Sequence, residues 1–283
     1  RQDVTERLNV YASVNRGFKA GTFNLQSPGN LPALPQYIMA YEAGVKSELF
    51  DRRVRLNLAA YHYDIDDFQV RSSALLGNLG AGTSTLQNAA TVKVDGIDAD
   101  FEVAATSRLR FFGGATLLNS RFAKFGGPGA ATQAAYVYYG PATCDAQGTK
   151  APGKETGPQT GGLVVCLGDA SGNKLPLSPR FAGSLGATYT LPVGAEGEVR
   201  ASALYNYNDG YFLEPDNRRR QGSFNLLNGS IEYRPVPQFG LELWGKNLTK
   251  AKYAVQALST APFSTTELMG APRTYGFNLN LNF

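Results

Sequence analysis

Apolar and polar residues alternate along most of the chain with a period of two residues. At the C-terminal end, Tyr275, Phe277, Leu279, Leu281 and Phe283 occupy one side of the alternation, and glycine or asparagine occupies the other. No segment sustains the 3.6-residue period of an amphipathic helix. The pattern predicts an all-β, antiparallel protein. About ten strands are expected, at residues 1–16, 37–50, 53–71, 87–105, 107–123, 178–192, 196–208, 222–234, 238–250 and 271–283.

The alternation changes phase within the third expected strand. Val54, Leu56 and Leu58 are apolar at even positions, whereas Tyr61 and Tyr63 place their rings at odd positions. One extra residue in a strand moves all later side chains to the other face of the sheet. The change therefore predicts a β-bulge near these tyrosines.

The connections between the expected strands alternate between long and short. Tight turns are expected at 51–52, 105–107, 193–196 and 235–238, and long connections at 17–36, 72–86, 124–177, 209–221 and 251–270. A transmembrane β-barrel has short turns on one side of the membrane and longer loops on the other, whereas a β-sandwich has no such requirement. Several expected strands exceed 12 residues, against an average of about 5–6 in soluble proteins. The pattern favours an antiparallel transmembrane barrel, in which Asp98, Asp100 and Glu102 would line the interior.

Composition narrows the function classes. Lys and Arg total 27 against 23 Asp and Glu, so the charge is too evenly mixed to indicate nucleic-acid binding. The mean hydropathy of −0.23 and the lack of a long apolar run exclude a helical membrane protein. His62 is the only histidine. No Ser/His/Asp triad or His-rich zinc site can therefore be assembled, and we expect no catalytic residue, metal or cofactor. His62 is expected in the barrel wall near the outer rim.

Several stretches together resemble the barrel domain of TonB-dependent outer-membrane receptors. They cover most of the chain in the expected order. The stretches are residues 11–24 (YASVNRGFKAGTFN), 41–50 (YEAGVKSELF), 56–70 (LNLAAYHYDIDDFQV), 88–90 (NAA), 96–101 (GIDADF), 177–181 (LSPRF), 243–249 (LWGKNLT) with Tyr253, and 272–276 (PRTYG) before Phe283.

The resemblance implies a function for the intact protein. Receptors of this family sit in the outer membrane of Gram-negative bacteria and import a scarce ligand, most often a ferric siderophore, using energy delivered through the TonB complex. Residues 1–283 would be the C-terminal portion of a barrel of about 22 strands. The plug domain and TonB box lie N-terminal to the barrel in the family and are absent from this chain. Expected partners are membrane lipid, lipopolysaccharide, the TonB complex through the plug, and the barrel-assembly machinery. That machinery would read a terminal signal of Tyr275, Phe277, Leu279, Leu281 and Phe283.

Two groups in the expected external loops are candidates for ligand contact. Arg218, Arg219 and Arg220 would capture an anionic ligand such as an iron–siderophore complex, or contact lipopolysaccharide phosphates, or be solvated. Tyr136, Tyr138 and Tyr139 would stack on a planar ligand or pack the loop against its neighbours.

Cys144 and Cys166 both fall in the longest expected loop, 22 positions apart. In an oxidising compartment, a disulfide that pins the loop is expected rather than free thiols.

Two other classes of protein were weighed. An outer-membrane protease of the omptin kind also has ten strands, but it needs acidic residues paired with histidine, and no matching acidic motif accompanies His62 in the sequence. A soluble β-sandwich adhesin is opposed by the strand length. The chain is therefore predicted not to be an enzyme.

Overall fold

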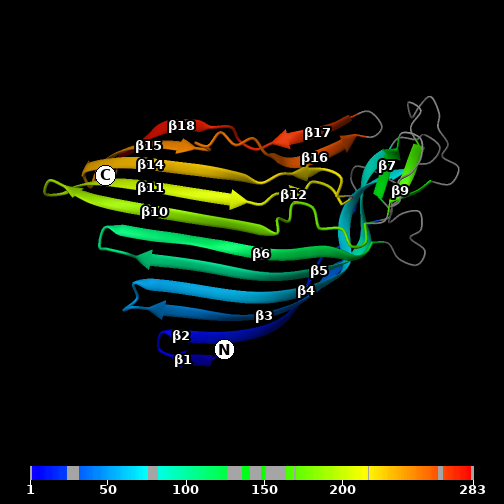
Figure 1. Cartoon of the computed structure of the whole chain (residues 1–283), viewed down its shortest axis with the longest axis horizontal. Helices are drawn as coiled ribbons and strands as arrows, with labels where there is room; N and C mark the ends of the chain where they lie inside the picture. The colour runs from blue at the N-terminus through cyan, green and yellow to red at the C-terminus, as the bar shows by residue number, and fades with distance from the viewer. Residues whose placement is uncertain are drawn as a thin grey trace.

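The fold is a single large antiparallel sheet with small hairpins at one end (Figure 1). The computed structural model describes residues 2–23, 32–75, 82–125, 136–140, 148–150, 164–168, 170–215, 217–260 and 264–281. In sheet order, the strands are β1 (Gln2–Thr5), β2 (Leu8–Lys19), β3 (Gln36–Leu49), β4 (Val54–Leu75), β5 (Gly82–Ala104), β6 (Leu109–Phe125), β10 (Phe181–Val193), β11 (Gly197–Asn208), β14 (Phe224–Val236), β15 (Phe239–Lys246) and β18 (Thr274–Leu281).

Each of these eleven strands pairs with its neighbour in chain order, always antiparallel. A β-sandwich would divide them between two facing sheets, and the described residues do not. The all-β antiparallel prediction is confirmed, and the sandwich alternative is wrong for the part of the chain that the structure describes.

The tight turns gather at the left end of Figure 1 and the long connections at the right, as predicted. The turn between β3 and β4 places Phe50, Asp51 and Arg52 at φ values of 52°, 54° and 65°. The turn between β10 and β11 uses Gly194 at φ 67°. Glycine adopts positive φ without strain, whereas the three residues of the first turn adopt it at some cost. We call the left end the turn end and the right end the loop end.

The long connections contain secondary structure that the alternation did not predict. The smaller strands are β7 (Tyr136–Gly140), β8 (Gly148–Lys150), β9 (Val164–Gly168), β12 (Tyr211–Phe212), β13 (Arg220–Gln221), β16 (Ala254–Thr260) and β17 (Ser264–Met269). They pair as β7-β9-β8, β12-β13 and β16-β17. In addition, β4 and β5 are 22 and 23 residues long, so strand pairing occupies most of the connection expected at 72–86.

The first expected strand was wrong in its boundaries. The structure has two strands in this region, β1 and β2, and the chain reverses between them at Glu6 and Arg7. The backbone N–H of Arg7 donates to the Thr5 hydroxyl at 3.2 Å. Such a side-chain bond to the backbone two residues later stabilises a local turn. Three consecutive polar residues, Thr5 to Arg7, could have indicated this turn in the sequence.

The sheet has one apolar face and one polar face. Ile97 on β5 pairs with Leu117 on β6, and both side chains are 51% exposed. Asp98 pairs with Thr116 on the opposite face. Because successive side chains of a strand point to opposite faces of the sheet, this pairing places apolar residues on one face and polar residues on the other. An exposed apolar face of this extent is unfavourable in water but suits lipid.

The predicted bulge exists but lies further along the strand. Pairing between β4 and β5 is regular through Tyr61, Tyr63 and Ile65. The register shifts between Ile65 and Phe68, where Asp67 has φ 54°, and again between Phe68 and Gln69. Tyr61 and Tyr63 stay in phase because they lie on the polar face and stack on each other with ring centroids 4.9 Å apart. The sequence reading placed the bulge too early because it counted these amphipathic rings as apolar.

A small core lies at the loop end of β4, β5 and β6. Val92 and Phe122 are fully buried there, packed with Ile65 and Phe125. The segment after β9 covers this core: Ala170 is fully buried in it, and the following turn hydrogen-bonds to the backbone of Phe122 at 2.7 and 2.9 Å. The core fixes the base of the longest connection to the sheet.

Candidate functional site

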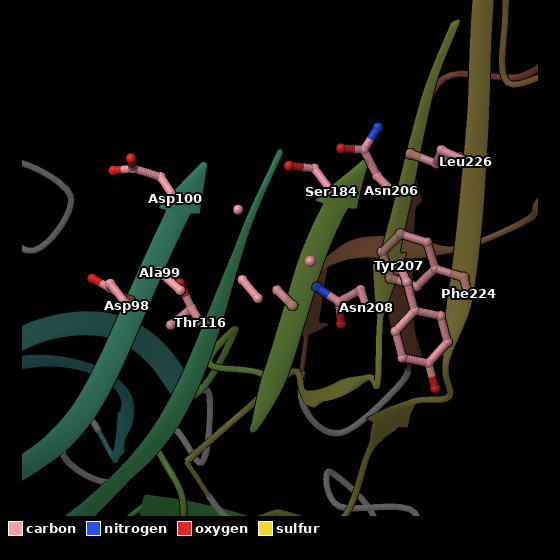
Figure 2. Close-up of a pocket in the computed structure, with 14 residues that line it drawn as sticks. Asp98, Ala99, Asp100, Thr116, Ser184, Asn206, Tyr207, Asn208, Phe224 and Leu226 are labelled. Atoms are coloured by element: carbon pink, nitrogen blue, oxygen red, sulfur yellow. The ribbon is translucent and has the colours of Figure 1, made fainter. Parts of the chain in front are cut away.

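A hollow of about 540 Å³ lies on the polar face, across β5, β6, β10, β11 and β14 (Figure 2). Asp98 and Asp100 enter it from β5, two positions apart and therefore on one face. Thr116, Ser184 and Asn206 stand on the neighbouring strands. The hollow thus presents two carboxylates beside neutral hydroxyl and amide groups.

Negative charge on β5 is neutralised at the turn end but not in the hollow. Glu102 binds Arg55 at 2.7 Å and Arg110 at 3.1 Å. Asp100 instead accepts a hydrogen bond from the Asn57 amide at 2.7 Å, and neither Asp98 nor Asp100 forms an ion pair within the described residues.

One oxygen of Asp98 is left unsatisfied. Its Oδ1 is buried and has no hydrogen-bond partner among the described residues, while the carboxylate also contacts the Tyr61 hydroxyl. A buried acceptor without a donor is unfavourable. The hollow can therefore accept hydrogen bonds from a cationic or N–H donor placed inside the barrel.

Aromatic rings lie flat along the polar face because each covers a glycine on the next strand. A Cβ atom on Gly276 would lie 2.7 Å from the ring of Trp244. Covering a strand glycine with an aromatic ring compensates for its missing side chain. The pairs on this face are Tyr11–Gly44, Tyr61–Gly96, Phe112–Gly186 and Trp244–Gly276. They explain part of the high glycine content.

The three candidate arginines lie at the loop end, and each has an interaction partner. Arg219 lies 3.5 Å from Glu214 and 4.0 Å from Glu267 of β17. Arg220 donates to the backbone carbonyl of Asp209 at 3.4 Å, and Arg218 also has an interaction partner. An anionic ligand would compete with these partners, so ligand capture by the arginines stays a prediction.

The candidate tyrosines lie on β7, within the sheet β7-β9-β8. In the pairing of β7 with β9, Tyr138 lies opposite Cys166. Cys144 lies outside the described residues. Stacking by Tyr136, Tyr138 and Tyr139 and the Cys144–Cys166 disulfide both stay predictions.

Two hairpins at the loop end are tied together, a relationship that the sequence did not reveal. The Tyr211 hydroxyl donates to the carbonyl of Ala254 at 2.8 Å, and the backbone N–H of Ala254 donates to Gln221 at 2.7 Å. Phe224 and Tyr253 stack with centroids 4.4 Å apart and planes 9° apart. Burial raises the pKa of Tyr211 above its ordinary 10.0, and Tyr253 adds to the rise. These contacts join β12-β13 to β16-β17.

Asn247 organises the base of the second hairpin. Its side-chain amide donates to the carbonyls of Ala251 and Ala271 at 2.9 and 3.0 Å, and its side-chain oxygen accepts from the N–H of Ala251 at 2.8 Å. It is 5% exposed and has φ 50°. Asparagine tolerates this left-handed conformation better than most residues. Asn247 belongs to the stretch LWGKNLT, which resembles the receptor family. Its role in the hairpin is visible only in the structure.

His62 lies on β4 opposite Asp95 of β5, on the same face as Ile97 and next to the apolar pairs of that face. Its expected position near the outer rim stays a prediction. The histidine does have acidic neighbours: Nδ1 lies 2.7 Å from Asp95 and Nε2 lies 3.2 Å from Asp64. The pairing with Asp95 could not be seen in the sequence, because it depends on the register between β4 and β5. Both ring nitrogens are occupied, so neither is available as a general base.

The described part of the terminal set lies together on the apolar face. Tyr275, Phe277, Leu279 and Leu281 on β18 are 75%, 71%, 55% and 53% exposed. Phe283 lies outside the described residues. A role of these residues in barrel assembly stays a prediction.

Within the described ranges, no group of three or more His, Cys, Asp or Glu side chains could hold a metal ion. The same ranges contain no helix that is long and apolar enough to span a membrane.

Comparison with known proteins identifies relatives along the whole chain. Residues 3–248 match the family model described as TonB dependent receptor-like, beta-barrel. The chain is 19% identical to the pesticin receptor of Yersinia enterocolitica over 99% of its own length and 34% of that protein. It superposes on the ferric yersiniabactin uptake receptor FyuA of Yersinia pestis with a TM-score of 0.72 and 18% identity, covering 99% of this chain and 36% of that one. It superposes on the siderophore receptor PiuA of Acinetobacter baumannii with a TM-score of 0.68 and 18% identity, covering 98% and 34%. The chain thus spans about a third of the length of these relatives, each of which is named as a receptor.

Proposed function

Since the chain belongs to the TonB-dependent receptor-like β-barrel family, we propose that it is the C-terminal part of the barrel of a receptor that imports a scarce ligand across the outer membrane of a Gram-negative bacterium. The ligand class that we propose is a ferric siderophore. The match of the family model to residues 3–248 is the observation that carries this proposal.

The two faces of the sheet support placement in an outer membrane. Side chains such as Ile97 and Leu117 would meet lipid, while Asp98 and Asp100 would face the interior of a closed barrel. The short turns would then face the periplasm and the loop end would face outside. The names of two relatives, a ferric yersiniabactin uptake receptor and a siderophore receptor, support the ligand class.

The remaining partners follow from this assignment. A plug domain with a TonB box, encoded upstream of this portion, would occupy the barrel interior and connect it to the TonB complex. The external hairpins, with Arg218, Arg219 and Arg220 and with Tyr136, Tyr138 and Tyr139, would contact the ligand. Lipopolysaccharide would surround the outer rim, and the barrel-assembly machinery would insert the chain.

The proposal is tested by iron uptake. The full-length gene would be expressed in a Gram-negative strain that lacks its own siderophore receptors, and ⁵⁵Fe uptake would be measured with a panel of ferric siderophores under iron limitation. We expect accumulation with at least one siderophore, abolished when the tonB gene is deleted.

The control receptor would carry Arg108→Gln in the tight turn between β5 and β6, which should insert and transport normally because it alters only an exposed group away from the loop end. Folded barrel would be scored by heat-modifiable migration of outer-membrane fractions. Uptake that is the same with and without TonB, or a correctly inserted receptor that transports none of the siderophores, would contradict the proposal.

A further inference from the structure

Three basic residues lie side by side across neighbouring segments at the loop end. Lys93 on β5 is the direct cross-strand partner of Arg121 on β6, and Arg121 is the bridge partner of Lys174 in the segment that follows β9. Directly paired residues point to the same side of a sheet, so the three side chains share one face. We call Lys93, Arg121 and Lys174 the basic row.

The basic row carries more positive charge than its neighbours neutralise. Lys93 binds Asp64 at 3.2 Å, whereas Arg121 and Lys174 are exposed and have no acidic partner among the described residues. Like charges directly opposite each other are unfavourable in a sheet. Asp64 is shared with His62, and Asp95 is bonded to His62, so nearby acids do not remove the excess. An anion bound across the basic row would remove this excess positive charge.

The row lies just beyond the apolar face. Along β5 and β6, the paired residues on this side change from Ile97 and Leu117 to Asp95 and Asn119, and then to Lys93 and Arg121. Four residues of strand correspond to about 13 Å. In a tilted strand this distance leads from hydrocarbon to the headgroup region, which extends about 5–8 Å beyond the core on each side. The row is therefore at the level of lipid headgroups and faces away from the barrel interior.

Backbone contacts hold Lys174 in place. Its N–H donates to the Asn217 side chain at 2.8 Å, and its carbonyl accepts from the Asn217 amide at 2.9 Å. The neighbouring Asn173 carbonyl accepts from the N–H of Phe122 at 2.9 Å. Phe122 is fully buried. The third member of the row is thus positioned by the folded core and not by an unsupported loop.

We propose that the basic row binds a phosphate group of a lipid in the outer leaflet of the membrane. Arginine matches the geometry of phosphate oxygens with its two parallel N–H donors, and lysine adds a compact charge on either side. The ligand proposed for transport would enter through the opposite, polar face, so it does not compete for this surface. The inference goes beyond the proposed transport function and requires only that the barrel is inserted in the membrane.

The experiment uses the full-length receptor purified in detergent, with lipid binding measured by native mass spectrometry. The probes are bis-phosphorylated lipid A, lipid A from which both phosphates have been removed, and inorganic phosphate. We expect the phosphorylated lipid to bind at least tenfold more tightly than the dephosphorylated one. The double variant Arg121→Gln/Lys174→Gln should lose this difference.

The matched control is Lys252→Gln/Arg273→Gln, which removes the same charge from exposed positions away from the row and should bind lipid A as the parent does. Heat-modifiable migration confirms that each variant is folded. Equal binding of phosphorylated lipid A by the parent and by Arg121→Gln/Lys174→Gln would overturn the proposal. Displacement of the lipid by inorganic phosphate at similar concentration would overturn it too, because the row would then be a site for free phosphate. If iron uptake were absent while the preference for phosphorylated lipid A remained, only the proposed transport function would be contradicted.

Discussion

Gly44 on β3 lies directly against the ring of Tyr11 on β2, so that a Cβ atom at position 44 would come within 2.6 Å of Cε1, Cζ and the hydroxyl oxygen. The same hydroxyl donates to Glu42 at 2.7 Å. The glycine therefore lets the ring lie along the wall while its polar end reaches a carboxylate on the same strand.

Gly44→Ala should destabilise the barrel by about 1–3 kcal/mol, because the added methyl group overpacks the wall and displaces the ring. The measurement is urea unfolding of the full-length receptor in lipid vesicles, followed by heat-modifiable migration. Adding Tyr11→Ala to Gly44→Ala should remove most of the clash, so the double variant should lose less stability than the two single losses added together. Additive losses would mean that the ring and the glycine are not coupled.

Asn247→Ala and Asn247→Gly should separate hydrogen bonding from backbone conformation. Both remove the bonds to Ala251 and Ala271, but only alanine is strained at φ 50°. We expect both to destabilise the protein by at least about 2 kcal/mol, with alanine the worse by up to about 1 kcal/mol. Limited proteolysis between residues 251 and 271 should detect the loosened hairpin. Protection equal to that of the parent in both variants would show that the side chain does not hold the hairpin.

Tyr211 should titrate later than an ordinary tyrosine. Its pKa is raised in the folded protein, so its bond to Ala254 stabilises the hairpins fully below pH 10.0 and is lost as pH rises through the higher, folded value. Subtracting the phenolate absorbance of Tyr211→Phe from that of the parent should give a midpoint above 10.0. Tyr211→Phe should also speed amide exchange at Ala254. A midpoint at or below the ordinary value would mean that Tyr211 is exposed to water.

Asp98→Asn/Asp100→Asn should impair transport more than folding. These carboxylates lack cationic partners among the described residues, so replacing them breaks no ion pair of the wall. The replacement instead weakens their interaction with any hydrogen-bond donor or cation inside the barrel. We expect several-fold slower ⁵⁵Fe uptake with normal insertion. Glu102→Gln is the control: Arg55 and Arg110 already neutralise its charge, and the loss of these exposed pairs costs at most about 1 kcal/mol each. Equal uptake by the two variants would remove the hollow from the transport path.

Cys144 and Cys166 should be joined in protein isolated from the cell envelope. Alkylation under non-reducing conditions followed by mass spectrometry should find neither thiol modified. Reduction should lower the stability of the loop, since closing a loop between positions 22 apart contributes about 3 kcal/mol in the chain-entropy account. Two alkylated cysteines would refute the pairing.

The strands of the wall could be predicted because the period of two persists wherever one face of the sheet is apolar and the other polar. Pairs such as Ile97 with Leu117 and Asp98 with Thr116 repeat this rule, so both the fold class and the resemblance to the receptor family were confirmed. Amphipathic side chains obscured the pattern. Tyr61 and Tyr63 lie on the polar face. Because both were counted as apolar residues, the bulge was expected at these tyrosines, whereas it lies at Asp67.

The site could not be predicted in the same way because its contacts join residues distant in sequence. His62 meets Asp95 across β4 and β5, and Tyr211 reaches Ala254 across 43 positions. Arg219 was recognised as a basic residue in an external segment, but its contact with Glu267 depends on how two hairpins pack. Composition gives the chemistry of such groups, while their partners follow only from the register and packing of the sheet.

The length of β4 and β5 has a mechanical consequence. At about 3.3 Å per residue, a 22-residue strand measures about 70 Å, whereas an apolar band about 25 Å tall requires only about 10 residues of tilted strand. The two strands remain paired beyond the register shifts on either side of Phe68, so they form a two-stranded arm that extends past the length an apolar band would need. Because the arm is continuous with the wall, it moves when the wall moves. It should bend near Asp67, where the pairing of β4 with β5 is irregular. A force applied at its outer end would therefore reach the wall along the paired strands and also through Gln69, whose side-chain amide donates to the carbonyls of Ala20 and Leu34 at 3.0 and 2.9 Å.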